Sequence, residues 1–281
     1  MKFLSFAIAN QPSYGYLAED GIVDLGRRLA GRAEDLRTLL AQPEPLALAR
    51  EVGGAADYRL EEVTLLPVIP NPEQIFCVGL NYAEHVAETN HQSTEQPMIF
   101  LRVPASQVGH GQPLLLPRES ERFDYEGEIA VIIGKPGRRI READAWDHIA
   151  GYACYNDGSV RDWQLHTAQW GPGKNFYRTG GFGPWMVTSD EIGPDAEMTL
   201  VTRVNGVELQ RASTRQMIHS IPKLIAYLST VTPLVPGDVI VTGTPGGIGL
   251  KRTPPLFLKP GDKVEIEVDR IGILVNGVAD D

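Results

Sequence analysis

Two glutamates separated by one residue give the first indication of chemistry in this sequence. They lie in Asp124-Tyr125-Glu126-Gly127-Glu128, which runs directly into an apolar segment over residues 129–133. Successive side chains of a strand alternate between its faces, so Glu126 and Glu128 are expected to point the same way. Their negative charges then repel, and a divalent cation such as Mg²⁺ or Mn²⁺ would remove the conflict. For such a pair taken alone, the alternative is a solvated strand edge.

A third carboxylate follows another apolar run. Residues 149–155 are apolar and lead into Asn156-Asp157, which places Asp157 at the end of a predicted strand. Asn-Asp-Gly taken alone is typical of a turn. If Asp157 instead joins Glu126 and Glu128, a cation held by these carboxylates would keep positions open for water and substrate, as is usual for Mg²⁺.

A histidine and a glutamate three residues apart could form a general base. His85 and Glu88 lie in a segment with helical character, where residues at this spacing are neighbours on one face. Glu88 would orient the imidazole and raise its basicity, so that His85 could take a proton from water. The alternative is an exposed ion pair on a helix surface. The motif H-E-x-x-H is absent from the sequence, which argues against a zinc protease of that type.

Two glycine-containing segments could contact an anion. Lys174 lies in Gly171-Pro172-Gly173-Lys174, and a lysine there could stabilise an oxyanion or hold a carboxylate. Residues 242–249 follow an apolar strand and contain four glycines, so their backbone N–H groups could cradle an anion. This segment matches neither a P-loop nor a complete G-x-G-x-x-G, so it indicates nucleotide binding only weakly. A surface lysine and a structural glycine turn are the alternatives.

The elements that must position these residues are mostly short strands. Asn205-Gly206 between two β-type runs predicts a tight hairpin. Pro222 follows Ser220 at the start of a segment with apolar residues at helical spacing, which predicts a helix. Apolar runs predict strands over residues 3–9, 14–17, 21–25, 75–79, 129–134, 149–155, 185–188, 200–204, 239–243 and 264–268, and helical patterns lie over 34–40, 83–88 and 220–228.

Three prolines mark a boundary near residue 70. Pro67, Pro70 and Pro72 fix the backbone and disfavour helix in the residues before them, which predicts a stiff linker. We therefore expect a β-rich α+β protein. It would have a small N-terminal α/β domain over residues 1–70 and a main domain over residues 71–281.

Composition restricts the class of protein. The 281 residues are 42% hydrophobic and 22% charged, which is typical of a folded globular chain. The net charge of −10 argues against a general nucleic-acid-binding protein, which needs a basic face. No run of about 18 apolar residues occurs, so we expect no membrane span and a cytoplasmic location. Cys77 and Cys154 each lie in apolar runs and are predicted to be buried free thiols.

Taken together and in this order, the motifs resemble the fumarylacetoacetate hydrolase superfamily. The resemblance covers about residues 72–278, and the order of five separate motifs makes it specific. The matching segments are Gly79-Leu80-Asn81-Tyr82 with His85 and Glu88, Asp124 to Glu128, Asn156-Asp157 with Arg161-Asp162 and Gln164, Gly173-Lys174-Asn175-Phe176, and Gly243-Thr244-Pro245-Gly246-Gly247. At positions 158 and 160 this sequence has Gly and Val, unlike many members of the superfamily. We expect this difference to affect the shape of the pocket and not the binding of the metal.

The resemblance implies a mixed β-roll around a metal site and assigns roles by position. It implies a homodimer that uses Mg²⁺ or Mn²⁺, with Ca²⁺ as a further option, and a lid that carries the base. The implied metal ligands are Glu126, Glu128 and Asp157, the implied catalytic residues are His85, Glu88 and Lys174, and the implied substrate contacts are Arg161, Gln164 and Thr244.

The reaction expected from this resemblance is hydrolysis of a C–C bond in a small 2,4-dioxo acid such as an acylpyruvate. The cation would hold the 2-oxo acid, and His85 with Glu88 would activate water. The alternative is tautomerisation or decarboxylation of an oxaloacetate-like 2-oxo acid in the same pocket. A metal- and ligand-binding protein without catalysis is a third and more remote hypothesis.

Overall fold

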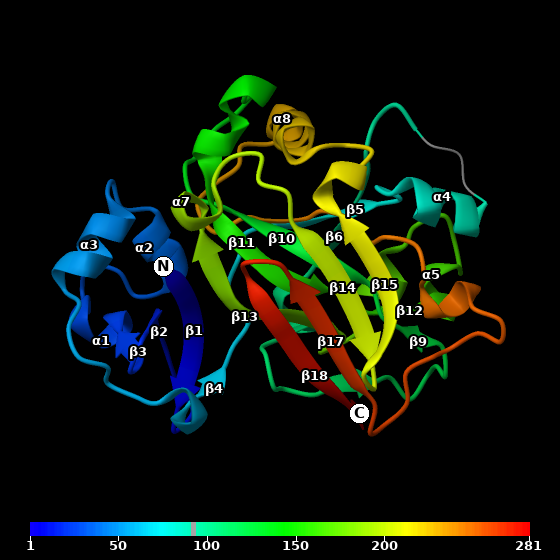
Figure 1. Ribbon diagram of the computed structural model, residues 1–281, viewed down its shortest axis with the longest axis horizontal. Helices are drawn as coiled ribbons and strands as arrows, with labels where there is room; N and C mark the ends of the chain where they lie inside the picture. The colour runs from blue at the N-terminus through cyan, green and yellow to red at the C-terminus, as the bar shows by residue number, and fades with distance from the viewer. Residues whose placement is uncertain (91–93) are drawn as a thin grey trace.

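The computed structural model describes residues 1–90 and 94–281 and shows a strand-rich α+β protein, as predicted (Figure 1). Its largest sheet has eleven strands, nine of them in the order β3-β2-β1-β13-β11-β10-β16-β5-β6, while β4 pairs with β1 and β7 with β13. The strands of this sheet are β1 (Lys2–Ile8), β2 (Gln11–Ala18), β3 (Gly21–Asp24), β4 (Thr64–Leu65), β5 (Ile75–Gly79), β6 (Met98–Arg102), β7 (Gln107–Val108), β10 (Gly127–Ile133), β11 (Ile149–Asn156), β13 (Gly180–Thr188) and β16 (Val239–Val241).

A five-stranded sheet in the order β15-β14-β17-β18-β8 packs across β10, β11 and β13, and a small pair joins β9 to β12. The hairpin predicted at Asn205-Gly206 is confirmed, because both residues have positive φ and Val204 pairs with Val207. These strands are β8 (Leu114–Leu116), β9 (Phe123–Asp124), β12 (Ser159–Val160), β14 (Thr199–Val204), β15 (Val207–Ser213), β17 (Lys263–Val268) and β18 (Gly272–Asp280).

Short helices cover the ends and outer faces of the sheets. The longest, α8, begins as predicted with Pro222 in its first turn, although Ser220 at the cap position makes no side-chain capping bond. The helices are α1 (Leu25–Arg28), α2 (Leu36–Leu40), α3 (Pro45–Glu51), α4 (Ala83–Thr89), α5 (Arg161–Gln164), α6 (Gly171–Lys174), α7 (Ser189–Ile192) and α8 (Ile221–Val231), and the 3₁₀ turns are η1 (Leu60–Glu62), η2 (Pro104–Ser106), η3 (Glu142–His148), η4 (Thr214–Gln216) and η5 (Gly249–Lys251).

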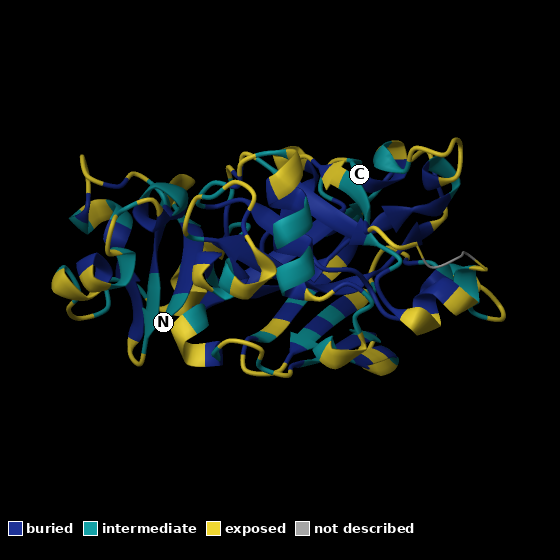
Figure 2. Ribbon diagram, turned by 90° about the horizontal axis from the view of Figure 1, so that it is seen from above, coloured by how far each residue is buried: buried dark blue, intermediate teal, exposed yellow. Residues whose placement is uncertain are grey.

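The central strand β10 is buried on both faces, and Figure 2 shows dark blue, buried ribbon through the middle of the molecule. Ile129, Val131 and Ile133 pack in the core beneath the five-stranded sheet. Ala130 and Ile132 point the other way, into a core shared with the N-terminal helices. This double burial explains why residues 129–133 form a continuous apolar run. Cys77 and Cys154 are buried free thiols, as predicted.

The main sheet continues across the predicted boundary at residue 70, because β1 pairs with β13 through Lys2↔Val187 and Phe3↔Met186. The division into domains at this point stays a prediction. Within the part of the chain that the structure describes, no helix is both long enough and apolar enough to cross a membrane.

Candidate active site

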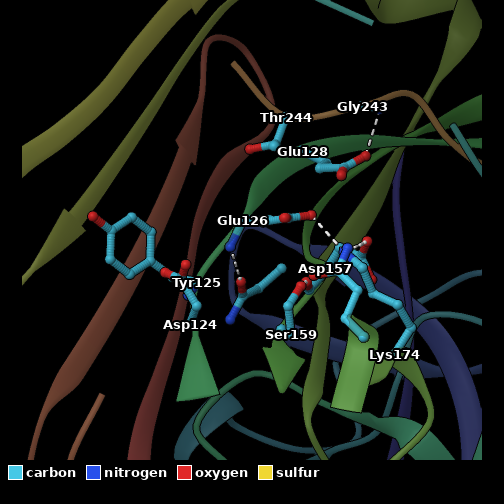
Figure 3. A network of polar contacts seen from close by, with 12 residues as sticks. Asp124, Tyr125, Glu126, Glu128, Asp157, Ser159, Lys174, Gly243 and Thr244 are labelled. Carbon is cyan, nitrogen blue, oxygen red and sulfur yellow. Dashed lines mark hydrogen bonds and ion pairs between the residues drawn. The ribbon is translucent and has the colours of Figure 1, made fainter. Parts of the chain in front are cut away.

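Three buried carboxylates converge where β10 and β11 lie side by side (Figure 3). Glu126 precedes β10, Glu128 lies within it, and Asp157 directly follows β11. The pairing of Gly127 with Asn156 and a 2.8 Å bond from the Asp157 amide to the Glu126 carbonyl hold the two segments in register. One oxygen of each carboxylate lies within 4.8 Å of the others. The sequence indicated this convergence, and the solvated strand edge does not occur.

The electrostatics of this triad fit a divalent cation. Burial raises the pKa of Glu128 well above its ordinary value, and the nearby charges of Asp157 and Glu126 raise it further. Burial has the same tendency at Glu126, but Lys174 and Arg161 outweigh it and hold the pKa of Glu126 below its usual range. A hard dication would relieve the repulsion at Glu128, and carboxylate oxygens are the ligands that Mg²⁺ and Mn²⁺ prefer.

Lys174 and Arg161 contact different oxygens of the Glu126 carboxylate, and each also contacts one further carboxylate. Nζ of Lys174 donates to Oε2 of Glu126 at 2.7 Å and to Oδ2 of Asp157 at 2.6 Å. Arg161 donates to Oε1 of Glu126 at 2.6 Å and to Oδ2 of Asp124 at 2.8 Å. Lys174 is thus bound to two of the protein's own carboxylates, and its expected contact with an oxyanion stays a prediction.

The buried cluster contains one more acidic group than basic groups. Asp124 joins the triad as a fourth buried carboxylate, while the cations are Arg102, Arg161 and Lys174. With all seven groups charged, the cluster carries one net negative charge, and a dication would make it positive by one. A metal-loaded site therefore favours an anionic ligand.

Arg161 also determines how Gln164 faces the cavity. Its Nη1 donates to Oε1 of Gln164 at 2.9 Å. Because a guanidinium can only donate, the oxygen of Gln164 must face Arg161, and the amide NH₂ group stays available for a ligand. Nη2 of Arg161 is itself buried and finds no hydrogen-bond partner among the described residues. An unpaired buried donor is costly, so an anion beside it would be favourable.

The predicted base is formed on α4. Nδ1 of His85 lies 2.7 Å from Oε1 of Glu88, and Oε2 of Glu88 accepts a 2.9 Å hydrogen bond from the Gly247 amide. His85 is only 6% exposed and lines the central cavity, so the pair is not an exposed surface pair. Since Nδ1 faces the carboxylate, Nε2 is the ring nitrogen available to a substrate.

The glycine segment after β16 does cradle anions, but they belong to the protein. The Gly243 amide donates to Glu128, the Gly247 amide to Glu88, and the Gly249 amide to Asp124. The hydroxyl of Thr244 donates to the Gly127 carbonyl at 2.9 Å and accepts from Gln210. Thr244 lines the cavity, but its hydroxyl proton is already in use.

These groups surround one cavity of about 170 Å³. Its apolar wall includes Trp170, whose indole packs against Phe100 with the ring centroids 5.7 Å apart. Nζ of Lys174 lies 5.0 Å from the centroid of the same Phe100 ring. The lining residues are Val78, Gly79, Leu80, His85, Thr89, Phe100, Glu126, Glu128, Arg161, Gln164, Leu165, Trp170, Lys174, Thr244, Ile248, Leu250 and Lys251.

The structure thus brings together all nine residues singled out from the sequence, eight of them on the cavity or in the triad and Glu88 behind His85. Sequence reasoning missed Arg102, Phe100 and Trp170, and it gave Asp124 no role. Arg102 ends the apolar strand β6, and a charge at that place was the one available signal. No sequence signal indicated the aromatic wall, because Phe100 and Trp170 are distant in sequence.

Comparisons with known proteins identify the family of this chain. Residues 74–279 match the model of the family described as fumarylacetoacetate (FAA) hydrolase, C-terminal. The chain is 38% identical over 287 residues to the mitochondrial oxaloacetate tautomerase fahd2 of Xenopus laevis, covering 99% of this chain and 90% of that protein. It is 42% identical over 229 residues to the oxaloacetate tautomerase YisK of Bacillus subtilis (strain 168), covering 80% and 76% of the two chains.

Solved structures agree as well. A fumarylacetoacetate hydrolase from Exiguobacterium antarcticum is 32% identical, with a TM-score of 0.82 and complete coverage of both chains. A maleylpyruvate hydrolase from Sphingobium sp. SYK-6, in complex with manganese(II) and pyruvate, is 28% identical, with a TM-score of 0.82 and coverage of 100% of this chain and 99% of that one. Fold, motifs and similarity lead to one conclusion: the chain belongs to the fumarylacetoacetate hydrolase family.

Proposed function

We propose that this protein is a Mg²⁺- or Mn²⁺-dependent tautomerase of a small 2-oxo dicarboxylic acid of the oxaloacetate class. The observation that carries the proposal is the position of His85. Its imidazole lines the same cavity as Glu126, Glu128 and Arg161. A base would therefore face the same small cavity as a metal ion and an arginine, both of which could bind an anionic substrate. Relatives named oxaloacetate tautomerases at 38% and 42% identity support this reaction over the hydrolysis favoured from the sequence.

Each group has a definable task. Glu126, Glu128 and Asp157 would hold the cation, which when bound would polarise the 2-oxo group as a Lewis acid. Arg161 and the amide of Gln164 would bind the carboxylate of the substrate and orient it. His85 would take a proton through Nε2 from the carbon next to the oxo group, and the imidazolium would then give that proton to the oxo oxygen, which completes the enol. The reverse transfers would regenerate the keto form. Glu88 would stabilise the imidazolium that forms meanwhile.

The anionic character of the substrate follows from charge. With all its groups charged, the buried cluster and a dication together carry one positive charge, and Nη2 of Arg161 has no hydrogen-bond partner within residues 1–90 and 94–281. The apolar wall excludes water from one side of the cavity, which strengthens these interactions. We also infer a homodimer from the family resemblance and a cytoplasmic location from the two buried free thiols. The mass of the protein in solution and its location in cells would test them.

The test is the keto–enol interconversion of oxaloacetate, followed by the loss of enol absorbance with and without Mg²⁺ or Mn²⁺. We expect acceleration that needs the metal, is lost in H85A, and is kept in H166A, whose parent histidine is exposed and does not line the cavity. Pyruvate release, measured in parallel, separates decarboxylation from tautomerisation. If the metal-loaded protein leaves the interconversion at its spontaneous rate, the proposal is wrong.

Hydrolysis of an acylpyruvate remains a second candidate, because the same His85–Glu88 pair could activate water. The maleylpyruvate hydrolase with a similar fold gives this candidate some support. A panel of acylpyruvates tested under the same conditions would reveal it. Hydrolysis faster than the tautomerisation of oxaloacetate would make it the main activity.

A further inference from the structure

Arg102 is a buried cation to which the proposed mechanism assigns no role. It is the last residue of β6, and its side chain is fully buried. Its Nη1 donates to Oδ1 of Asp157 and to the Gly158 carbonyl at 3.1 Å. Nη2 donates to Thr179 at 3.0 Å, and Nε donates to Ser106 at 3.2 Å. Such a set of bonds fixes the guanidinium in one orientation.

These contacts divide the carboxylate of Asp157 between two tasks. Oδ1 is occupied by Arg102, and Oδ2 points to the position where Lys174 also contacts Glu126. Rotation of the carboxylate to present both oxygens would break the bond to a fully buried arginine. Breaking one partner of a buried ion pair is costly, so Asp157 is confined to one oxygen.

The other two carboxylates of the triad are divided in the same way. Oε1 of Glu126 accepts from Arg161, and Oε2 of Glu128 accepts from the backbone amide of Gly243. Each of the three carboxylates therefore has one oxygen bound by Arg102, Arg161 or the Gly243 amide. The second oxygens of Glu126 and Asp157 both accept from Nζ of Lys174. A cation at the triad could therefore use at most one oxygen of each carboxylate, and it would share the oxygens of Glu126 and Asp157 with Lys174 or displace its ammonium.

We propose that Arg102 is a positioning residue that confines Asp157 to one metal-binding oxygen, and that the site thereby selects Mg²⁺ or Mn²⁺ over Ca²⁺. Mg²⁺ requires six ligands in octahedral geometry and keeps several waters, which suits three single oxygens. Ca²⁺ takes six to eight oxygens and commonly binds carboxylates through both. The inference rests on the metal dependence of the proposed function but not on the identity of the reaction.

The test measures metal binding without substrate. Mn²⁺ and Ca²⁺, added as chlorides, are titrated separately into metal-free protein by calorimetry, and Mn²⁺ binding is checked by electron paramagnetic resonance. We expect the wild type to bind Mn²⁺ at least tenfold more tightly than Ca²⁺. In R102M the affinity for Mn²⁺ should fall about 10- to 100-fold, and the affinity for Ca²⁺ should fall less, so the preference narrows.

Three further variants complete the experiment. R102K keeps the positive charge, but one ammonium cannot bind Asp157, Gly158 and Thr179 together. Its preference for Mn²⁺ over Ca²⁺ should therefore lie between those of the wild type and R102M. S106A removes the hydroxyl that accepts a hydrogen bond from Nε of Arg102. It should reduce the preference for Mn²⁺ over Ca²⁺ by less than R102M does, and it provides the test if R102M does not fold. R138M changes an exposed arginine and should behave as the wild type.

The outcomes separate positioning from a merely structural role. A structural role would lower the unfolding temperature of the metal-free protein and weaken both metals by the same factor. That result overturns the proposal, as do unchanged affinities in R102K and S106A, or a wild type without preference for Mn²⁺. Because no turnover is measured, failure of the tautomerase assay would leave this result interpretable.

Discussion

The carboxylate of Glu88 accepts a 2.9 Å hydrogen bond from the backbone amide of Gly247, while its other oxygen lies 2.7 Å from His85. The helix that carries the base is thereby fastened to the loop whose Gly243 amide binds Glu128. One short segment of chain, residues 243–247, therefore sets the position of the proposed base, His85, relative to Glu128, a proposed metal ligand.

We expect E88Q to lower kcat by about 10²-fold with little change in KM, because an amide cannot stabilise the imidazolium of His85. Steady-state kinetics with oxaloacetate and Mn²⁺ measure both constants. E84Q is the matched control, since Glu84 lies on the same helix and is exposed. A kcat of E88Q equal to that of E84Q would show that Glu88 does not assist the base.

Gly79 determines where the apolar wall of the cavity can lie. A Cβ atom at this position would come within 2.3 Å of Cζ3 of Trp170, so G79A must displace the indole. We expect G79A to lose about 1–3 kcal/mol of unfolding free energy and to raise KM, as measured by denaturant titration and kinetics. In G171A the added methyl group meets no atom of the residues that the structure describes within 4 Å, so both quantities should stay near those of the wild type.

Glu128 should make the metal-free protein less stable and the metal-loaded protein more stable. Since its buried charge is opposed by Asp157 and Glu126, E128Q should unfold at the same or a higher temperature than the wild type without metal. With Mn²⁺ in excess the order should reverse, because a ligand present at 100 times its Kd adds about 2.7 kcal/mol. E121Q, which alters an exposed glutamate close by, should respond to Mn²⁺ as the wild type does. A normal Mn²⁺ response in E128Q would remove Glu128 from the ligand set.

Asp238 should give the stability a measurable dependence on pH. Burial raises its pKa to about 6, although the Val235 and Gln74 amides oppose this. The folded protein thus holds this proton more tightly than the unfolded chain, whose pKa is about 3.9. The free energy of unfolding therefore falls as the pH rises from about 4 to about 6, by an amount on the order of 3 kcal/mol.

The variant D238N isolates this effect. It is expected to be less stable than the wild type, because Asp238 accepts hydrogen bonds just before β16. The difference in unfolding free energy between the two proteins should decrease as the pH rises from 4 to 6. Other carboxylates titrate in both proteins and cancel in the difference. A difference that stays constant over this range would mean that Asp238 has an ordinary pKa in the folded protein.

Much of the fold could be predicted because its strands are apolar and its turns carry clear signals. The run that became β10 and the Asn205-Gly206 turn are examples. Strands rich in glycine and proline could not be predicted in full. β13 begins at Gly180, whereas the apolar run indicated residue 185, and its early residues Gly180 and Gly181 are held by pairing with β7. Tertiary pairing there outweighs local propensity.

The candidate site was predictable where one strand or one helix turn places the residues. Glu126 with Glu128, and His85 with Glu88, are of this kind. The contact of Arg102 with Asp157 joins residues 55 positions apart and depends on three-dimensional packing alone. The expected anion cradle over residues 242–249 was correct in its chemistry, but the sequence could not show that its anions are Glu128, Glu88 and Asp124.

The pairing of β1 with β13 has a practical consequence for anyone who trims the chain. In a fragment that begins after residue 70, the backbone of Met186 and Val187 would form an unpaired sheet edge where β1 had been. The apolar side chains of Ala130 and Ile132 would lose their packing against the N-terminal residues. Unpaired edge strands of this kind can pair with strands of other molecules. Such a fragment should precipitate or self-associate, whatever its active-site residues.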